Sequence, residues 1–252
     1  MMNSSICYRL NKQNQKTNRM TYVLGARCSD GVVLIGDTKM TVNNGTNEKF
    51  GDKITGELTG VLTGFSGLRD QFEPFRSQFR ELRRSSQTHF TPDRVLKSIK
   101  DIIRSLYSQY GNRFNLELLV GISRADLGEK SVLYYFHDDG LYQHIDNDYK
   151  AIGAEPYGKI YLNQLWNQEM NMDQTAELGY FIIRYIEKFR LDLTVGTGGD
   201  RPHPQVRFIP DEKPSEEIYD YPPTIDQCET YELNAKIRLE RIQNSIINDY
   251  NI

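Results

Sequence analysis

A methionine–threonine pair, Met20-Thr21, stands at the start of the first run of β-branched and apolar residues in the chain. If the chain is cut between these two residues, Thr21 becomes N-terminal and carries a free α-amine beside its hydroxyl group. A hydroxyl group alone is a poor nucleophile, but an α-amine with an ordinary pKa of about 8 can accept its proton, directly or through one water. A mature chain that begins at Thr21 would therefore hold a nucleophile and its base in one residue.

Two charged residues, Asp37 and Lys53, are candidates to tune this centre. An ammonium group near Thr21 favours its deprotonated form because it repels an extra proton, and a carboxylate can hold that ammonium group in place. Asp37 ends the apolar run VVLIGD, and Lys53 begins the run KITGEL. The chemistry that these three residues predict is acyl transfer through a covalent intermediate.

No metal and no other cofactor are expected in this chemistry. The histidines show no H-E-x-x-H motif or comparable ligand spacing. They are His89, His137, His144 and His203. We therefore expect the reaction to depend on the side chains and backbone groups of the chain alone.

The segments that carry the three residues are predicted to be strands. The first two, 21–28 and 32–37, are joined through an Asp30-Gly31 step, which favours the tight turn of a hairpin. The polar segment Val42–Lys49 is expected to be a loop, and the run Lys53–Phe65 predicts two more short strands that turn at Gly56 or Gly60. Four strands therefore precede the first expected helix.

Gly64 to Gly67 (GFSG) is expected to end this sheet, because apolar residues recur at helical spacing from Leu68 onward. The later helices are expected from Pro92, behind the N-cap Thr91, and over Pro156–Trp166, Asp173–Arg190 and Asp226–Tyr250. Further strands are expected at LELLVGIS, SVLYYF, LYQHID, Tyr149–Gly153 and Gln205–Ile209.

Strands in two blocks and helices in two blocks predict an α+β fold, a four-layer αββα sandwich of two antiparallel sheets with helices on both outer sides. We expect a leader or propeptide over residues 1–20 and one folded domain over 21–210. Residues 211–252 are expected to form an acidic linker and a C-terminal amphipathic helix. That helix either reaches across a neighbouring subunit or folds back on its own domain.

Composition and charge exclude several classes of protein. The 31 basic and 34 acidic residues give a net charge of -3, with no basic cluster on an aromatic-rich stretch, so we expect no nucleic-acid partner. Three widely separated cysteines without C-x-x-C spacing indicate a reducing, cytoplasmic environment. The apolar runs are short and interrupted by charges, and the leader has no apolar core, so neither a membrane span nor export is expected.

Counted from Thr21, the spacing of Asp30-Gly31, Asp37 and Gly51-Asp52-Lys53-Ile54 resembles that of a divergent, archaeal-like β-type proteasome subunit. In that family the N-terminal threonine, an acidic residue at the end of the second strand and a lysine at the start of the third form the active centre. Thr21, Asp37 and Lys53 fall into this register without a gap. The resemblance covers about residues 21–209 and implies the N-terminal-nucleophile hydrolase fold.

The resemblance implies roles for further residues. It places Gly64 on the oxyanion-hole glycine of the family and Asp192 on the aspartate that supports the threonine amine. The residues that would wall the primary specificity pocket are Met40, Gly51, Leu62 and Ser66. Because such a pocket is apolar and of medium size, we expect a mild preference for cleavage after hydrophobic residues.

The resemblance also implies an activity and partners. The expected activity is that of a threonine endopeptidase, which hydrolyses unfolded polypeptides inside a ring of proteasome-type subunits. A homo-oligomer is expected, and an ATPase unfoldase is the further partner that the resemblance implies.

The sequence departs from the family pattern at three positions. Ala154 and Val195 stand where the family usually has supporting serines, and Met20 stands where self-processed members have glycine. Two alternatives therefore stay open: a catalytically silent structural subunit of the ring, or another N-terminal-nucleophile amidase or transpeptidase that needs no ring. Met20 also leaves two routes to a free Thr21, either cleavage of the leader or translation that starts at Met20.

Overall fold

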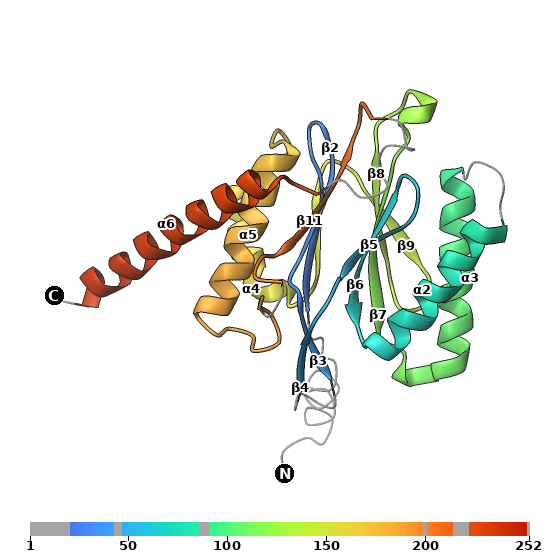
Figure 1. Cartoon of the computed structure of the whole chain (residues 1–252), viewed down its shortest axis with the longest axis horizontal. Helices are drawn as coiled ribbons and strands as arrows, with labels where there is room; N and C mark the ends of the chain where they lie inside the picture. The colour runs from blue at the N-terminus through green and yellow to red at the C-terminus, as the bar shows by residue number, and fades with distance from the viewer. Residues whose placement is uncertain (1–20, 43–46, 86–90, 199–200, 214–221, 251–252) are drawn as a thin grey trace, which may run out of the picture.

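The computed structural model describes residues 21–42, 47–85, 91–198, 201–213 and 222–250. The expected leader, 1–20, and residues 214–221 of the acidic linker therefore lie outside the described residues. Two antiparallel sheets pack face to face between two layers of helices (Figure 1). The predicted four-layer αββα arrangement is confirmed.

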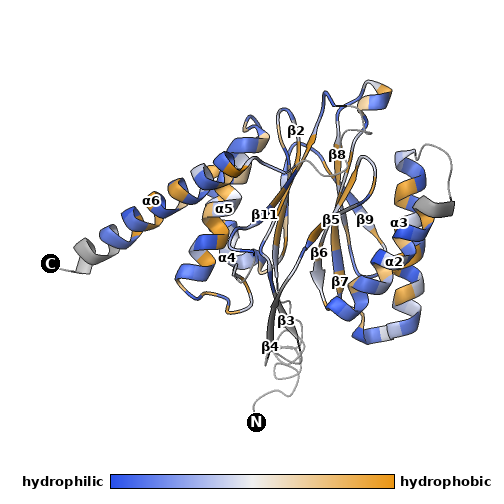
Figure 2. Ribbon diagram, in the orientation of Figure 1, coloured by the Kyte–Doolittle hydropathy of each residue, from blue (hydrophilic) through white to orange (hydrophobic). Residues whose placement is uncertain are grey.

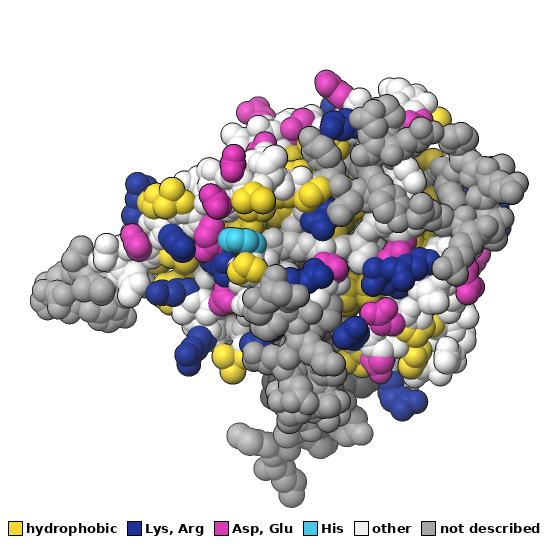
Figure 3. Space-filling view, viewed as in Figure 1, with side chains coloured by type: hydrophobic (Ala, Val, Ile, Leu, Met, Phe, Trp, Pro, Cys, Tyr) yellow, Lys and Arg dark blue, Asp and Glu magenta, His cyan; other side chains and the backbone are white. Residues whose placement is uncertain are grey.

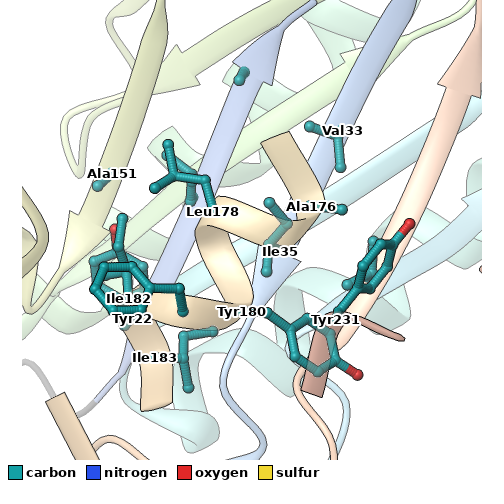
Figure 4. Packing of buried hydrophobic residues seen from close by; sticks show 14 of the residues in the cluster. Tyr22, Val33, Ile35, Ala151, Ala176, Leu178, Tyr180, Ile182, Ile183 and Tyr231 are labelled. Carbon is teal, nitrogen blue, oxygen red and sulfur yellow. The ribbon is translucent and has the colours of Figure 1, made fainter. Parts of the chain in front are cut away.

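The first sheet has the strand order β10-β1-β2-β11, and all its neighbours are antiparallel. Its strands are β1 (Tyr22–Arg27), β2 (Gly31–Gly36), β10 (Tyr149–Gly153) and β11 (Gln205–Pro210). Every residue of β1 and β2 is buried, because helices cover one face of the sheet and the second sheet covers the other. Alternate residues of β1 therefore face different layers. Tyr22 faces the helices and packs with Ile182 (Figure 4), whereas Val23 faces the second sheet.

The second sheet has the strand order β5-β6-β7-β8-β9, so β5 lies at its edge. Its strands are β5 (Ile54–Leu58), β6 (Val61–Gly67), β7 (Leu116–Ile122), β8 (Val132–Phe136) and β9 (Tyr142–Ile145). Figure 2 shows apolar residues concentrated along the strands of both sheets. A cluster that includes Val23, Leu34, Ile54 and Leu119 fills the space between the sheets and joins them into one core.

Helices cover the outer face of each sheet. The second sheet is covered by α2 (Arg69–Ser85) and α3 (Pro92–Tyr110), whose apolar side chains pack with Phe65, Leu118 and Phe136. The first sheet is covered by α4 (Glu155–Leu165) and α5 (Met172–Lys188). The last helix, α6 (Ile225–Tyr250), packs on α5 near its start and projects from the body toward its C-terminal end (Figure 1).

Two sequence predictions about the first strands were wrong. The segment Val42–Lys49, which was expected to be a loop, overlaps a separate two-stranded sheet of β3 (Lys39–Val42) and β4 (Asn47–Phe50). The sequence NEKF holds one apolar residue, so no alternating pattern indicated a strand there. The GFSG segment does not end the sheet either, because β6 continues through it to Gly67. Of the two glycines proposed for the turn before β6, Gly60 is the one that lies there.

The surface on the face seen in Figure 3 mixes basic and acidic side chains, without a large area of one sign. Interspersed charges of this kind provide no extended basic track for a phosphate backbone. Within the described residues, no helix combines the length and the apolar composition needed to cross a membrane.

Candidate active site

Three chain segments meet at one end of the two sheets and bring Thr21, Asp37 and Lys53 together. Thr21 directly precedes β1, and Asp37 directly follows β2. Because β1 and β2 are antiparallel neighbours, the start of one lies beside the end of the other, and Val23 is paired with Gly36. Lys53 precedes β5 of the second sheet, so its side chain reaches Asp37 from the facing layer.

The carboxylate of Asp37 is the centre of the hydrogen-bond network. Its Oδ1 atom accepts from the Thr21 hydroxyl group at 2.9 Å, from the Tyr22 N–H at 2.7 Å and from Lys53 Nζ at 2.8 Å. Its Oδ2 atom accepts from Lys53 Nζ at 2.9 Å and from the Gly196 N–H at 3.3 Å. The Thr21 hydroxyl group and the Lys53 ammonium group therefore converge on the same carboxylate oxygen.

Burial makes this network electrostatically strong. Thr21, Asp37 and Lys53 are 2%, 0% and 1% exposed. Burial lowers the pKa of the Lys53 ammonium group, and the charges of Asp37 and Asp192 act against that fall. Burial likewise raises the pKa of the Asp37 carboxyl group, against the effect of Lys53 and of the donors from Tyr22 and Thr21. Each member of this buried ion pair thus stabilises the charged form of the other.

The carbonyl group of Thr21 is fixed on its other side by the end of β10. Its oxygen accepts from the Ala154 N–H at 2.8 Å. Gly153 has a φ angle of +82°, and a methyl carbon added to it would lie 2.0 Å from the Thr21 oxygen and 2.9 Å from the Ser66 hydroxyl group. Gly153 therefore leaves the space into which Thr21 fits, and Ser66, at the end of β6, lies beside it.

Gly153→Ala is expected to displace Thr21 and to lower the free energy of unfolding by at least about 2 kcal/mol, because backbone strain adds to the clash. Gly128→Ala is the matched control, since Gly128 also has a positive φ angle, +67°, but has nothing within 4 Å of the added carbon. Denaturant unfolding of both variants measures the difference. Equal losses in the two variants would show that the close approach to Thr21 has no energetic consequence.

The two other predicted catalytic residues, Asp192 and Gly64, are related to this centre in different ways. Asp192 acts on Lys53 through its charge, while its Oδ1 atom accepts from the N–H and the hydroxyl group of Thr194. Gly64 lies inside β6, paired with Ile54 on one side and Leu119 on the other. The Phe65 N–H donates to the Lys53 carbonyl group in the direction of β5, so the Gly64 N–H points the opposite way, toward β7.

The structure separates two of the four predicted pocket residues, Leu62 and Ser66. Leu62 is 1% exposed and belongs to the core between the sheets, whereas Ser66 lies beside Thr21. Met40 is in β3, and the Gly51 N–H donates to the Thr38 carbonyl group. A pocket of about 280 Å³ borders the site, and it is lined by other residues, among them Lys39, Asp192, Val195 and Gly196.

The family model described as proteasome subunit matches residues 17–192. The chain belongs to the proteasome subunit family. No curated protein matches the chain.

Solved structures of this family's fold are similar over nearly the whole chain. Anbu (ancestral beta-subunit) from Yersinia bercovieri has 18% sequence identity and a TM-score of 0.73, with 90% of this chain and 97% of the other covered. A Gly-1 mutant of Anbu from Hyphomicrobium sp. strain MC1 has 18% identity and a TM-score of 0.71, over 90% and 96%. Anbu from Pseudomonas aeruginosa, solved as a helical assembly, has 14% identity and a TM-score of 0.70, over 90% and 96%. At these identities the similarity establishes the proteasome-type N-terminal-nucleophile hydrolase fold.

Some contacts of this proteasome-family site could not be found from the sequence. Gly196 donates its N–H to Asp37 from a segment far along the chain, and Ala154, which lacks the usual serine hydroxyl group, holds Thr21 through its backbone. Val195 is buried under the helices of the first sheet. Backbone donors carry no side-chain signal, so only the fold reveals them. Within the described residues, no group of three or more His, Cys, Asp or Glu side chains could hold a metal ion.

Proposed function

We propose that the chain is a threonine-type peptidase subunit in which Thr21 becomes the nucleophile after residues 1–20 are removed. The observation that carries this proposal is the buried network in which the Thr21 hydroxyl group and Lys53 Nζ bind the same oxygen of Asp37, at 2.9 Å and 2.8 Å. Membership in the proteasome subunit family supports the same assignment.

In the proposed reaction, Thr21 Oγ attacks the carbonyl carbon of a peptide bond while its proton passes to the Thr21 α-amine. The C–N bond of the substrate then breaks, and the proton moves to the leaving amine. The acyl group remains as an ester on Thr21 Oγ. One water molecule then attacks the ester carbonyl carbon while the α-amine takes its proton. The bond between the acyl carbon and Thr21 Oγ breaks, the α-ammonium group returns the proton to Oγ, and the acyl group leaves as a carboxylic acid.

Lys53 and Asp37 have separate roles in this reaction. The Lys53 ammonium group favours a negatively charged Thr21 oxygen and so makes the hydroxyl group a better nucleophile. Asp37 holds the ammonium group in place and is itself held by backbone donors from Tyr22 and Gly196. Asp192 is proposed to support the Thr21 α-amine once that amine is free.

The donor to the oxyanion is better assigned to Gly67 than to Gly64. Alternate N–H groups of a strand point the same way, so the Gly67 N–H follows that of Phe65 toward the β5 side. The strand β5 begins only at Ile54, and the register places Gly67 beyond its end, so no β5 residue pairs with Gly67. The hydroxyl group of Ser66, the residue before Gly67, lies close to Gly153 and the Thr21 carbonyl group, which supports this assignment. A donor in this role is typically worth about 3 kcal/mol of transition-state stabilisation.

The proposed working form is an assembly of identical subunits that act on unfolded polypeptides, supplied by an ATPase unfoldase. The P. aeruginosa Anbu protein was solved as a helical assembly. Identical subunits joined head to tail close into a ring or continue as a helix, depending on the rotation between neighbours. If either arrangement encloses the active sites, only extended polypeptide chains would reach them, even though the sites are broadly specific.

A silent structural subunit is the second candidate function, favoured by Ala154 and Val195, which bring no hydroxyl group to the site. Hydrolysis of fluorogenic peptides by the assembled protein separates the two candidates. We expect turnover of at least one of three peptides, which are cleaved after a hydrophobic, an acidic or a basic residue. No turnover of any of them would favour the silent subunit.

A further inference from the structure

Gln205 connects the two sheets directly beside the candidate active site. It is the first residue of β11, is 7% exposed, and is paired in register with Gly36 of β2. Its side chain leaves the first sheet and reaches β5 of the second. There its Oε1 atom accepts from the Lys53 N–H at 2.9 Å and from the Ile54 N–H at 2.9 Å, and its Nε2 atom donates to the Ile54 carbonyl group at 2.6 Å.

These contacts replace a missing neighbouring strand. Because β5 is the edge strand of its sheet, the outward N–H and carbonyl groups of Ile54 have no strand partner there. A side-chain amide carries the same donor and acceptor as a peptide group, so Gln205 satisfies both groups of Ile54. The same oxygen also accepts from Lys53, whose carbonyl group is held from the other side by the Phe65 N–H.

One residue is thereby linked to both members of the buried ion pair. Asp37 directly follows Gly36, the register partner of Gln205, and the Gln205 side chain binds the backbone of Lys53. Asp37 and Lys53 belong to different sheets, so their separation depends on how the sheets are held at this end. Three charged groups act on the Lys53 ammonium group: Asp37, Asp192 and Lys39.

We propose that Gln205 is a positioning residue, which fixes the Lys53 backbone so that the ammonium group stays on the Asp37 oxygen that also binds the Thr21 hydroxyl group. This inference rests on the proposed function of Thr21. Among the described residues, the Gln205 side chain makes no hydrogen bond to Thr21 or Asp37, and it acts through Lys53.

The test compares Gln205→Ala and Gln205→Glu with the wild-type assembly. Gln205→Glu keeps an oxygen for the two N–H groups but replaces the donor to Ile54 by an oxygen and adds a negative charge. It is the second variant if the alanine variant folds poorly. Gln143→Ala is the matched control, since Gln143 is an exposed glutamine on β9 of the same sheet as Lys53. Kinetics are expressed per active site, counted by stoichiometric acylation of Thr21 with a mechanism-based reagent.

We expect Gln205→Ala to lower kcat per site by about 10- to 100-fold, with little change in KM, because the chemistry depends on where the ammonium group stands. Gln205→Glu is expected to lose less, and Gln143→Ala to match the wild type. A second readout needs no turnover: competitive acylation of lysines, quantified by peptide mass spectrometry. Lys53 is 1% exposed, so it should label slowly in the wild type and faster in Gln205→Ala.

Two results would overturn the proposal. The first is a Gln205→Ala variant that melts at a lower temperature but keeps wild-type kcat per site, which would give Gln205 a structural role only. The second is unchanged labelling of Lys53 in that variant. If the wild type itself shows no hydrolysis that depends on Thr21, the proposed function has failed, and the labelling of Lys53 alone decides whether Gln205 holds this lysine.

Discussion

Thr21→Ala is expected to lower kcat for peptide hydrolysis by about three orders of magnitude or more, because alanine has no hydroxyl group to form the acyl ester. The fold should remain intact, since Thr21 precedes β1 and its hydroxyl group makes one hydrogen bond to Asp37. Hydrolysis of a fluorogenic peptide by the assembled variant measures the effect, and thermal unfolding confirms that the protein is folded.

Thr21→Ser is the matched control for this result. Serine keeps the hydroxyl group and the α-amine and loses only the methyl group, so measurable turnover should remain. If Thr21→Ala keeps more than about a tenth of the wild-type rate, another residue performs the chemistry and the mechanism proposed above is wrong.

Lys53→Ala is expected to lower the free energy of unfolding by about 3 to 5 kcal/mol, because it leaves the Asp37 carboxylate buried without its cation. Asp37→Asn should have a loss of similar size, because it leaves the Lys53 ammonium group buried without its counterion. The loss in the double variant Lys53→Ala/Asp37→Asn should be smaller than the sum of the single losses, since neither charge remains. Each single variant should also lower kcat by about 100-fold or more.

Denaturant unfolding of the two single variants and the double variant measures this coupling. Lys150→Ala is the control, because the Lys150 and Glu155 side chains form a partly exposed pair at 3.5 Å that should be worth less than about 1 kcal/mol. Additive losses at Lys53 and Asp37 would mean that the ion pair contributes no coupling. The Lys53 ammonium group would then have no fixed place beside the nucleophile.

The meeting of Thr21, Asp37 and Lys53 was predictable from the sequence because these residues stand at the ends of strands with clear signals. The Asp30-Gly31 step fixes the β1–β2 hairpin, and the hairpin places Thr21 beside Asp37. Lys53 opens the next apolar run, and the face-to-face packing of the two sheets brings its side chain to Asp37. Local patterns and the layer arrangement were therefore enough to bring these three residues together.

The supporting contacts were not predictable in the same way. Gly196 and Gln205 are separated by more than a hundred residues from the groups that they bind, and their contacts depend on how two sheets are aligned. Gly64 was assigned from its spacing along the chain, but strand direction decides where an N–H points, and this favours Gly67. Leu62 was assigned in the same way and lies in the core. Spacing along the chain predicts which strand holds a residue. The pairing and packing of that strand decide which way its N–H group and its side chain point.

The identity of the N-terminal residue tests the central claim most directly. The assembled protein should be treated with a mechanism-based acylating reagent, digested, and its N-terminal peptide mapped by mass spectrometry. The account predicts a peptide that begins at Thr21 and carries the acyl group on that residue. A chain that still begins at Met1 or Met20, or an adduct on any other residue, would contradict it.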